Sequence, residues 1–264
     1  MSADLVRVTT EGVVCTLLLD RPEVRNAMSR AMVDELRAGL AAAVADDAVR
    51  VVVVRGNGGH FCAGGDIQDM ARVHQIAVED GAPDPVVELN ASFGHMTRAF
   101  LEAPKPVVAV CEGVVMGGGF GLACAADVTL ASPTVDLRLP ETGLGVVPAQ
   151  IAPVLLRRMT VAEANRLALT GARIDAKRAL ASGIVHEVDE DVDALLARTV
   201  SRLIRGAPGA LAATKVLFNR LAPPPDEAMI QLAAEVFAKA TRSPEATEGT
   251  TAFLQKRKPS WAEG

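Results

Sequence analysis

Short runs of β-branched and other apolar residues alternate with longer segments whose apolar positions recur at helical spacing. The first two runs are residues 13–19 and 49–54, and between them residues 29–44 follow a helical pattern with Ser29 as its candidate N-cap. The pattern then continues as a helix, a strand, a helix and a strand, over residues 86–101, 106–111, 119–126 and 128–131. Strands that alternate with helices in this way predict an α/β fold.

Beyond about Thr160 the pattern becomes almost entirely helical. Only residues 185–188 keep the β-branched character of a strand. Residues 81–85 are typical of a loop, and the prolines at 223–225 predict a stiff turn. The predicted helices cover residues 161–169, 176–181, 192–205, 209–220 and 225–253.

Composition and charge exclude several classes of protein. Apolar residues make up 50% of the chain and charged residues 22%, which is the balance of a globular protein and not of a disordered one. A net charge of −5 and an aromatic content of 3% leave little to attract or stack on nucleic acid. The longest apolar stretch, residues 106–126, contains Glu112 and a glycine cluster, which disqualifies it as a membrane span. The chain starts without the features of a signal peptide, so we expect a cytoplasmic protein with no membrane or nucleic-acid partner.

Neither a metal nor a nicotinamide cofactor is expected. The four cysteines have no CxxC spacing and no partnering histidine cluster, so buried free thiols in a reducing compartment are the expected state. No serine in a nucleophile-elbow setting accompanies the histidines. The glycine clusters lack both the dinucleotide-binding and the P-loop spacing.

Two glycine-rich segments are the strongest candidates for chemistry. Residues 61–67 (FCAGGDI) and 117–121 (GGGFG) each lie where a strand-like run gives way to a helix-like one. Glycine lets the backbone approach a ligand closely, and the free N–H groups that open a helix favour negative charge. Together the two segments would form an oxyanion hole. Taken alone, residues 117–121 fit a tight strand-to-helix crossing without chemistry equally well.

Five motifs together resemble the crotonase (enoyl-CoA hydratase/isomerase) superfamily, over nearly the whole chain. They are residues 20–28 (DRPEVRNAM), 61–67, 117–121, 139–141 (LPE) and 253–259 (FLQKRKP). The resemblance implies a crotonase-like α/β spiral of repeated β-β-α units. It implies a core with the acyl-CoA site over residues 1–200 and a helical C-terminal trimerisation region over residues 201–264. A homotrimer or a dimer of trimers is expected, with coenzyme A as part of the substrate and not a separate cofactor.

By the same resemblance, the backbone N–H groups of Gly65 and Gly118 hold the thioester oxygen. One such preorganised donor is typically worth about 10²–10³ in rate. Three of the residues near the expected site have a second interpretation. Asp66 is either a helix cap or a substrate contact, and Arg25 is either an ordinary solvated arginine or a ligand of the CoA phosphates. Lys256 belongs either to a basic tail or to the binding site of the nucleotide. The residues that the resemblance places beside substrate or CoA are Arg25, Ala27, Ala63, Gly64, Asp66, Ile67 and Lys256.

Glu141 is the candidate acid/base, because it aligns with the second catalytic glutamate of the family's hydratases. A general acid/base contributes typically about 10²–10⁴ in rate, and the alternative is a surface carboxylate in a turn. Gly121 stands where hydratases with two glutamates carry the first one. The missing side chain is expected to enlarge the site for a branched or carboxylated acyl group. A glutamate introduced there is expected to restore the pair and to raise hydration of a short, straight substrate.

Residues 145–153 are similar to the corresponding segment of hydratases that act on branched glutaconyl-type CoA esters. Gln150 and Arg138 could then contact a substrate carboxylate, or they could be a loop hydrogen-bonding group and a surface charge. The function expected is hydration of an α,β-unsaturated acyl-CoA. The alternatives are a double-bond isomerase and a non-catalytic acyl-CoA-binding protein.

Overall fold

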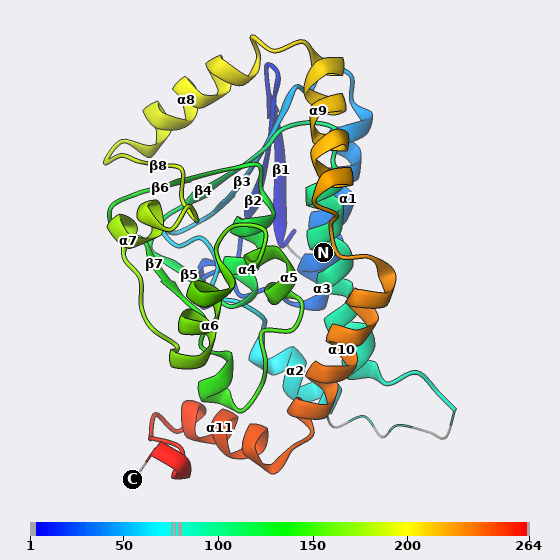
Figure 1. Cartoon of the computed structure of the whole chain (residues 1–264), viewed down its shortest axis with the longest axis vertical. Coiled ribbons are helices and arrows are strands. Elements are labelled where there is room, and N and C mark those ends of the chain that lie inside the picture. Colours follow the sequence, from blue (N-terminus) through cyan, green and yellow to red (C-terminus); the bar gives the residue numbers. More distant parts are fainter. Residues whose placement is uncertain (1–3, 75, 77, 79–80, 263–264) are drawn as a thin grey trace.

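The computed structural model describes residues 4–74, 76, 78 and 81–262, and it has the expected α/β architecture (Figure 1). Within these residues a larger sheet of six strands has the order β1-β2-β3-β4-β6-β8, and a smaller sheet pairs β5 with β7. Only β1 runs antiparallel to its neighbour. The strands are β1 (Val6–Glu11), β2 (Val14–Leu19), β3 (Val51–Gly56), β4 (Val107–Cys111), β5 (Val114–Met116), β6 (Val128–Ala131), β7 (Asp136–Arg138) and β8 (Glu187–Val188).

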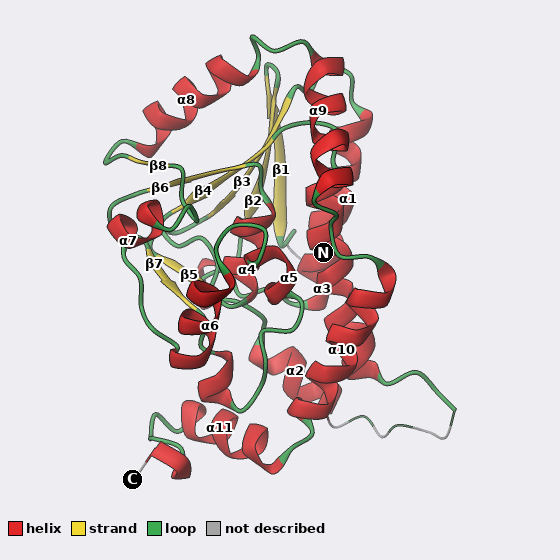
Figure 2. Cartoon of the chain, viewed as in Figure 1, coloured by secondary structure: helices red, strands yellow, loops and turns green. Residues whose placement is uncertain are grey.

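Helices surround the two sheets (Figure 2). Ser29 caps the first helix as expected, because its hydroxyl accepts a hydrogen bond from Met32 N. The α-helices are α1 (Arg30–Ala45), α2 (Ile67–His74), α3 (Pro85–Glu102), α4 (Gly118–Ala125), α5 (Ile151–Leu155), α6 (Val161–Thr170), α7 (Ala176–Ala181), α8 (Val192–Leu203), α9 (Pro208–Leu221), α10 (Glu227–Thr241) and α11 (Pro244–Leu254). The 3₁₀-helices are η1 (Pro22–Val24), η2 (Glu141–Leu144) and η3 (Ser260–Ala262).

The central strands β3 and β4 of the larger sheet are buried on both faces, whereas the edge strand β1 is mostly exposed. The valine run of β3 shows this directly, because Val52 and Val54 belong to the main hydrophobic core whereas Val51 and Val53 pack in a second cluster with Val192 of α8. Parallel strands with helices on both faces need such continuous apolar sequences. The main core lies on the side of the sheet that also carries α1, α3 and α4.

The second strands of the β-β-α units form a separate, smaller layer. Cys62, after β3, bridges in parallel to Val115 of β5, β5 pairs with β7, and Leu137 of β7 bridges to Ile174. The large-sheet strands β3, β4 and β6 are therefore each followed by a short segment in the small layer. The repeated β-β-α pattern is thus present, and its short segments end at one edge of the small layer.

Three details differ from the sequence expectations. The helix expected over residues 225–253 is two helices, because Ser243 caps α11 through Ala246 N and Pro244 lacks the N–H that a continuous helix needs. The strand expected over residues 185–188 is shortened to β8. The pattern also missed β1, β5 and β7, of which β5 and β7 have three residues each.

The C-terminal helices attach to the rest of the structure through apolar packing of α10 and α11 and through polar contacts. On α9, Lys215 Nζ lies 2.6 Å from Asp127 Oδ2, and at the end of α10 Arg242 lies 2.7 Å from Asp84 at the start of α3. Helix α11 packs against η2. Among the described residues, no helix combines the length and apolar character that crossing a membrane requires.

Candidate active site

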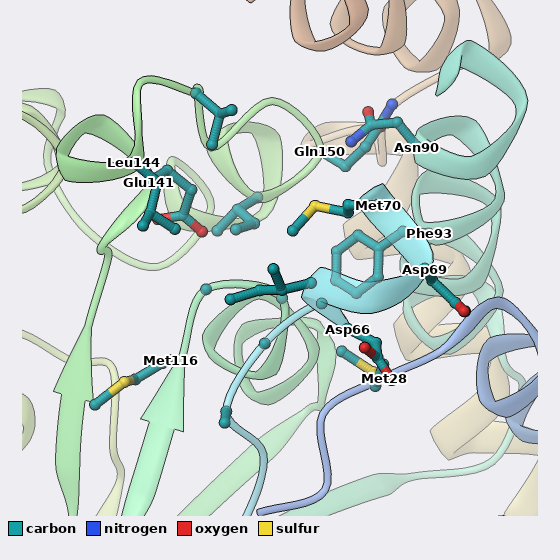
Figure 3. A pocket seen from close by; sticks show the side chains of 18 of the residues that line it. Met28, Asp66, Asp69, Met70, Asn90, Phe93, Met116, Glu141, Leu144 and Gln150 are labelled. Carbon is teal, nitrogen blue, oxygen red and sulfur yellow. The ribbon is translucent and has the colours of Figure 1, made fainter. Parts of the chain in front are cut away.

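A cavity of about 450 Å³ opens at the edge of the small layer (Figure 3). Its walls come from the segments after Cys62 and β5, from α2 and α3, and from residues 138–151. Phe237 of α10 and Phe253 of α11 complete the lining, so the predicted C-terminal region takes part in the cavity. Most of these side chains are apolar, which makes the few polar groups among them informative.

The three candidate catalytic groups follow neighbouring segments of the small layer. Gly65 follows Cys62, Gly118 follows β5 and Glu141 follows β7. Because these segments run parallel, their carboxyl ends meet at the same edge. The first two loops touch, since a Cβ at Gly64 would lie 3.6 Å from Gly118 N. Gly64 has φ +105°, a conformation that a residue with a side chain rarely adopts.

Two backbone N–H groups at this edge are free to bind a ligand. No hydrogen bond within the described part of the chain uses the N–H of Gly65 or of Gly118. Gly118 opens α4, so the positive end of the helix dipole adds to its N–H. A Cβ at Gly65 would meet open space, which places this residue at the cavity surface. Each of the two N–H groups is available to donate a hydrogen bond to a ligand in the cavity.

Glu141 brings a carboxyl group to the same place. Its side chain is buried, and Oε2 has no hydrogen-bond partner among the described residues. Burial raises the pKa of Glu141 from 4.5 to about 7, and its own backbone N–H offsets part of the effect. A Cβ at Gly117, where φ is +49°, would lie 2.8 Å from Glu141 Oε1. Glu141 can therefore take up and release a proton near neutral pH.

Asp66 has a structural position at the rim. Its Oδ1 accepts from Gln68 N at the start of α2, and its Oδ2 lies 2.8 Å from Arg21 Nη1. Its side chain therefore caps the helix, which was one of the two expectations. Arg25 is exposed, with φ +52°, and lines the cavity together with Ala63, Gly64, Asp66 and Ile67.

Two residues that the resemblance placed near CoA lie outside the cavity lining. Ala27 is close to it in sequence, and its carbonyl oxygen accepts from Arg21 Nη1. Lys256 is exposed just beyond α11. Its backbone N–H donates a hydrogen bond to the carbonyl oxygen of Phe253. Both positions are compatible with contact to a ligand that extends out of the cavity.

The space expected at Gly121 is occupied. Gly121 is buried and is not part of the lining, and a Cβ there would lie 3.3 Å from both Phe93 Cζ and Ile151 Cγ1. The ring of Phe93 also reaches to 3.3 Å from a Cβ at Gly118. The expectation that the missing glutamate side chain enlarges the site was therefore wrong. An aromatic ring from α3 takes up that volume.

Gln150 and Arg138 line the cavity with their donor groups already engaged. Arg138 Nε and Nη2 donate to Asp136 at 3.0 and 2.9 Å. Gln150 is 2% exposed, and its Nε2 donates to Ile230 O at 2.8 Å. These contacts favour the structural alternatives for both residues over direct contact with a substrate carboxylate.

Sequence reasoning missed Asn90 and Phe93 on α3. Asn90 lies one helical turn from both Val86 and Gly94, which are buried. A polar residue on this otherwise apolar face of the helix was the signal in the sequence that could have identified it as a site residue. Phe93 gave no signal of its own, because an aromatic residue on an apolar helix face is usual in a core.

Cysteine and metal chemistry find no support in the described residues. No group of three or more potential metal ligands occurs among them. All four cysteines are free and buried, as expected. Burial raises the pKa of Cys62 and of Cys124 to about 12, so neither is a ready nucleophile.

Comparison with known proteins gives consistent results. Residues 9–264 match the family model described as enoyl-CoA hydratase/isomerase. A carnitinyl-CoA dehydratase from Proteus mirabilis is 32% identical, with 97% of each chain covered. An enoyl-CoA hydratase/isomerase structure from Marinobacter aquaeolei is 46% identical with a TM-score of 0.80, covering 98% of this chain and 99% of the other. A putative enoyl-CoA hydratase structure from Mycobacterium avium paratuberculosis is 37% identical with a TM-score of 0.88, covering 98% of this chain and 100% of the other.

Proposed function

Because the chain belongs to the enoyl-CoA hydratase/isomerase family and has the crotonase fold, we propose that it adds water to an α,β-unsaturated acyl-CoA. The observation that carries the proposal is the meeting of three groups at one edge. The free N–H groups of Gly65 and Gly118 lie at the same edge as Glu141, a buried carboxyl group with a pKa of about 7. The dehydratase relative, by its name, acts on a CoA thioester in the reverse sense.

The reaction follows from what these groups can do. The thioester oxygen accepts hydrogen bonds from the N–H groups of Gly65 and Gly118, which stabilises the negative charge that develops there. The Glu141 carboxylate takes a proton from water as the water oxygen bonds to Cβ. The electron pair of the double bond moves towards the carbonyl and forms an enolate. Glu141 then returns its proton to Cα, so that one H and one OH have been added and the enzyme is regenerated.

The remaining site residues serve binding in this proposal. Arg25 at the cavity surface binds the phosphates of CoA in this proposal, and the exposed Lys256 binds its nucleotide end. The backbone around Ala63, Gly64 and Ile67 borders the thioester, and Ala27, outside the lining, meets a part of the ligand that extends out of the cavity. The chemistry uses neither a metal nor a nicotinamide, so a chelator is expected to leave turnover unchanged.

The second candidate is isomerisation, which the family description also includes. One carboxylate can remove a proton from Cα of a β,γ-enoyl-CoA and return it to Cγ, which moves the double bond into conjugation with the thioester. A third possibility is a member that binds acyl-CoA without turnover. The free Oε2 of Glu141 and its pKa near neutrality favour catalysis over mere binding.

A panel of enoyl-CoA esters separates the three, with the ultraviolet absorbance of the conjugated thioester as the readout. Hydration removes this absorbance from α,β-enoyl esters, whereas isomerisation creates it from β,γ-enoyl esters. A binding protein changes neither signal. Gain of absorbance from the β,γ-esters, without loss from any α,β-ester, would replace hydration by isomerisation.

A further inference from the structure

Two residues that line the cavity carry buried oxygen atoms that the hydration chemistry does not use. Among the described residues, four buried side-chain atoms lack a hydrogen-bond partner, and three of them belong to cavity-lining residues. Glu141 Oε2 is one of the three, and the proposed reaction accounts for it. The other two are Asn90 Oδ1 and Gln150 Oε1. Because buried polar atoms are nearly always hydrogen-bonded, two such acceptors in one cavity need an explanation.

Asn90 and Gln150 form a common patch, which we call the carboxamide patch. A Cβ at Gly94 would overlap Gln150 Oε1, so the Gln150 amide lies against α3 at Gly94. Asn90 precedes Gly94 by one helical turn and therefore shares that face of α3. Figure 3 shows the two amides together, with Glu141 on the other side of the cavity and Met70 and Phe93 between.

The orientation of Gln150 is fixed by its other contact. Its Nε2 donates to Ile230 O at 2.8 Å, and a flipped amide would place two oxygens against each other there. Oε1 therefore has to be the atom on the α3 side. Asn90 makes no hydrogen bond with any other described residue, so its carboxamide offers both an acceptor and a donor.

The surroundings of the patch are uncharged. All the lining residues contributed by α3 and by residues 144–151 are neutral. The arginines of the lining come from other segments: Arg138 is bound to Asp136, Arg30 is bound to Asp34, and Arg25 is exposed at the cavity surface. Two acceptor oxygens on segments that carry no cation in the lining would repel a carboxylate, whereas they match a neutral group that can donate a hydrogen bond.

We propose that the carboxamide patch is a subsite for a hydroxyl group on the acyl chain of the substrate, a few carbons beyond the double bond. The hydroxyl donates to one carboxamide oxygen and accepts from Asn90 Nδ2. This inference rests on the proposed function, since it assumes that an acyl-CoA occupies the cavity. It narrows the substrate class to enoyl-CoA esters with a hydroxylated chain.

Saturated acyl-CoA esters test the subsite without any turnover. The probes are butanoyl- to octanoyl-CoA with a hydroxyl on the last carbon, each compared with the ester one carbon longer, in which a methyl group replaces the hydroxyl. Affinities are measured by titration calorimetry. At the chain length that reaches the patch, the hydroxylated ester is expected to bind about tenfold tighter or better, because a site built to bond a hydroxyl rejects an analogue that lacks it.

Asn90→Leu tests the patch directly, because leucine has nearly the size of asparagine and no hydrogen-bonding group. The variant is expected to lose the preference for hydroxylated esters. It should bind the alkyl esters at least as tightly as the unsubstituted protein does. Asn165→Leu, on the exposed face of α6 and outside the lining, is the matched control and should keep the preference. The comparison of hydroxylated with alkyl esters on the unsubstituted protein needs no variant. It therefore remains a valid test even if Asn90→Leu does not fold.

Three results overturn the proposal: no hydroxyl preference at any length, a preference that survives Asn90→Leu, or tighter binding of esters that end in a carboxylate. A water molecule that holds both oxygens permanently would give the first result. Hydration of enoyl-CoA esters without hydroxyl preference refutes the subsite alone. Hydroxyl preference without hydration refutes the proposed reaction alone, and failure of every ester to bind refutes both.

Discussion

Glu141→Gln is the substitution that tests the proposed chemistry most sharply. Glutamine keeps the size of the side chain but cannot take a proton from water. If Glu141 performs both proton transfers, kcat is expected to fall by about 10²–10⁴ with little change in the affinity for saturated acyl-CoA. In the natural enzyme, kcat/KM for hydration is expected to rise with pH through about 7, because the carboxylate form is the base.

The same substitution has a stability effect of calculable sign. The folded-state pKa of about 7 exceeds the ordinary value of 4.5 by about 2.5, which at about 1.4 kcal/mol per pH unit corresponds to roughly 3 kcal/mol. Between these two pH values the folded protein holds a proton that the unfolded chain has released. The free energy of unfolding therefore falls as pH rises from 4.5 to about 7, and the loss is complete above that. Glutamine has no such pH-dependent loss.

Thermal unfolding at two pH values, with kinetics on the same samples, measures both effects. Near pH 8 the variant is expected to have a Tm several degrees higher than the natural chain, and near pH 4.5 the two should coincide. Glu163→Gln is the matched control, because hydrogen bonds from Arg166 and Arg178 lower the pKa of Glu163 to about 2. That variant should keep full activity and lose stability at neutral pH, with the deficit shrinking as pH falls from 4.5 towards 2. A loss of kcat below tenfold, or a Tm difference for Glu141→Gln that does not change with pH, would refute the reasoning.

Gly121→Glu is expected to lower both stability and hydration, because its Cβ would lie 3.3 Å from Phe93 and Ile151, and overpacking of this kind costs typically about 1–3 kcal/mol. Phe93→Ala in the same chain should relieve the crowding, so strictly additive Tm changes would contradict this account. The chain is expected to form a trimer or a dimer of trimers, since α9 has no buried residue and exposes Leu217, Phe218 and Leu221. A monodisperse monomer in light scattering at micromolar concentration would count against that assembly.

The periodic elements of the fold were predictable because their apolar patterns are long. Helices α1 and α3 and strands β3 and β4 differ from the expected ranges by no more than a few residues at either end. Strands β5 and β7 were not predictable, because a strand of three residues is too short to show an alternation of apolar and polar positions. Their pairing depends on the positions of the large-sheet strands that precede them, so the β-β-α repeat is visible in the structure and not in the hydrophobic pattern.

The candidate site is also partly predictable from the sequence and partly not. Glycine pairs and a Pro-Glu dipeptide in a recognisable order pointed to Gly65, Gly118 and Glu141, and the structure brings these residues to one edge. What surrounds them depends on distant packing. No local pattern says that Phe93 of α3 fills the place beside Gly121, or that Gln150 reaches both α3 and α10.

Phe93 also bears on the proposal that a single carboxylate performs both proton transfers. With an aromatic ring where a second glutamate would stand, no negative charge lies against Glu141, and burial alone raises its pKa. Two neighbouring carboxylates would instead titrate as a coupled pair, in which one ionises early and the other late. A lone buried carboxyl group near pKa 7 is close to evenly poised between base and acid at neutral pH, and the proposed reaction needs it first as one and then as the other. In the proposed reaction, the apolar ring at this position therefore leaves Glu141 suited to both proton transfers.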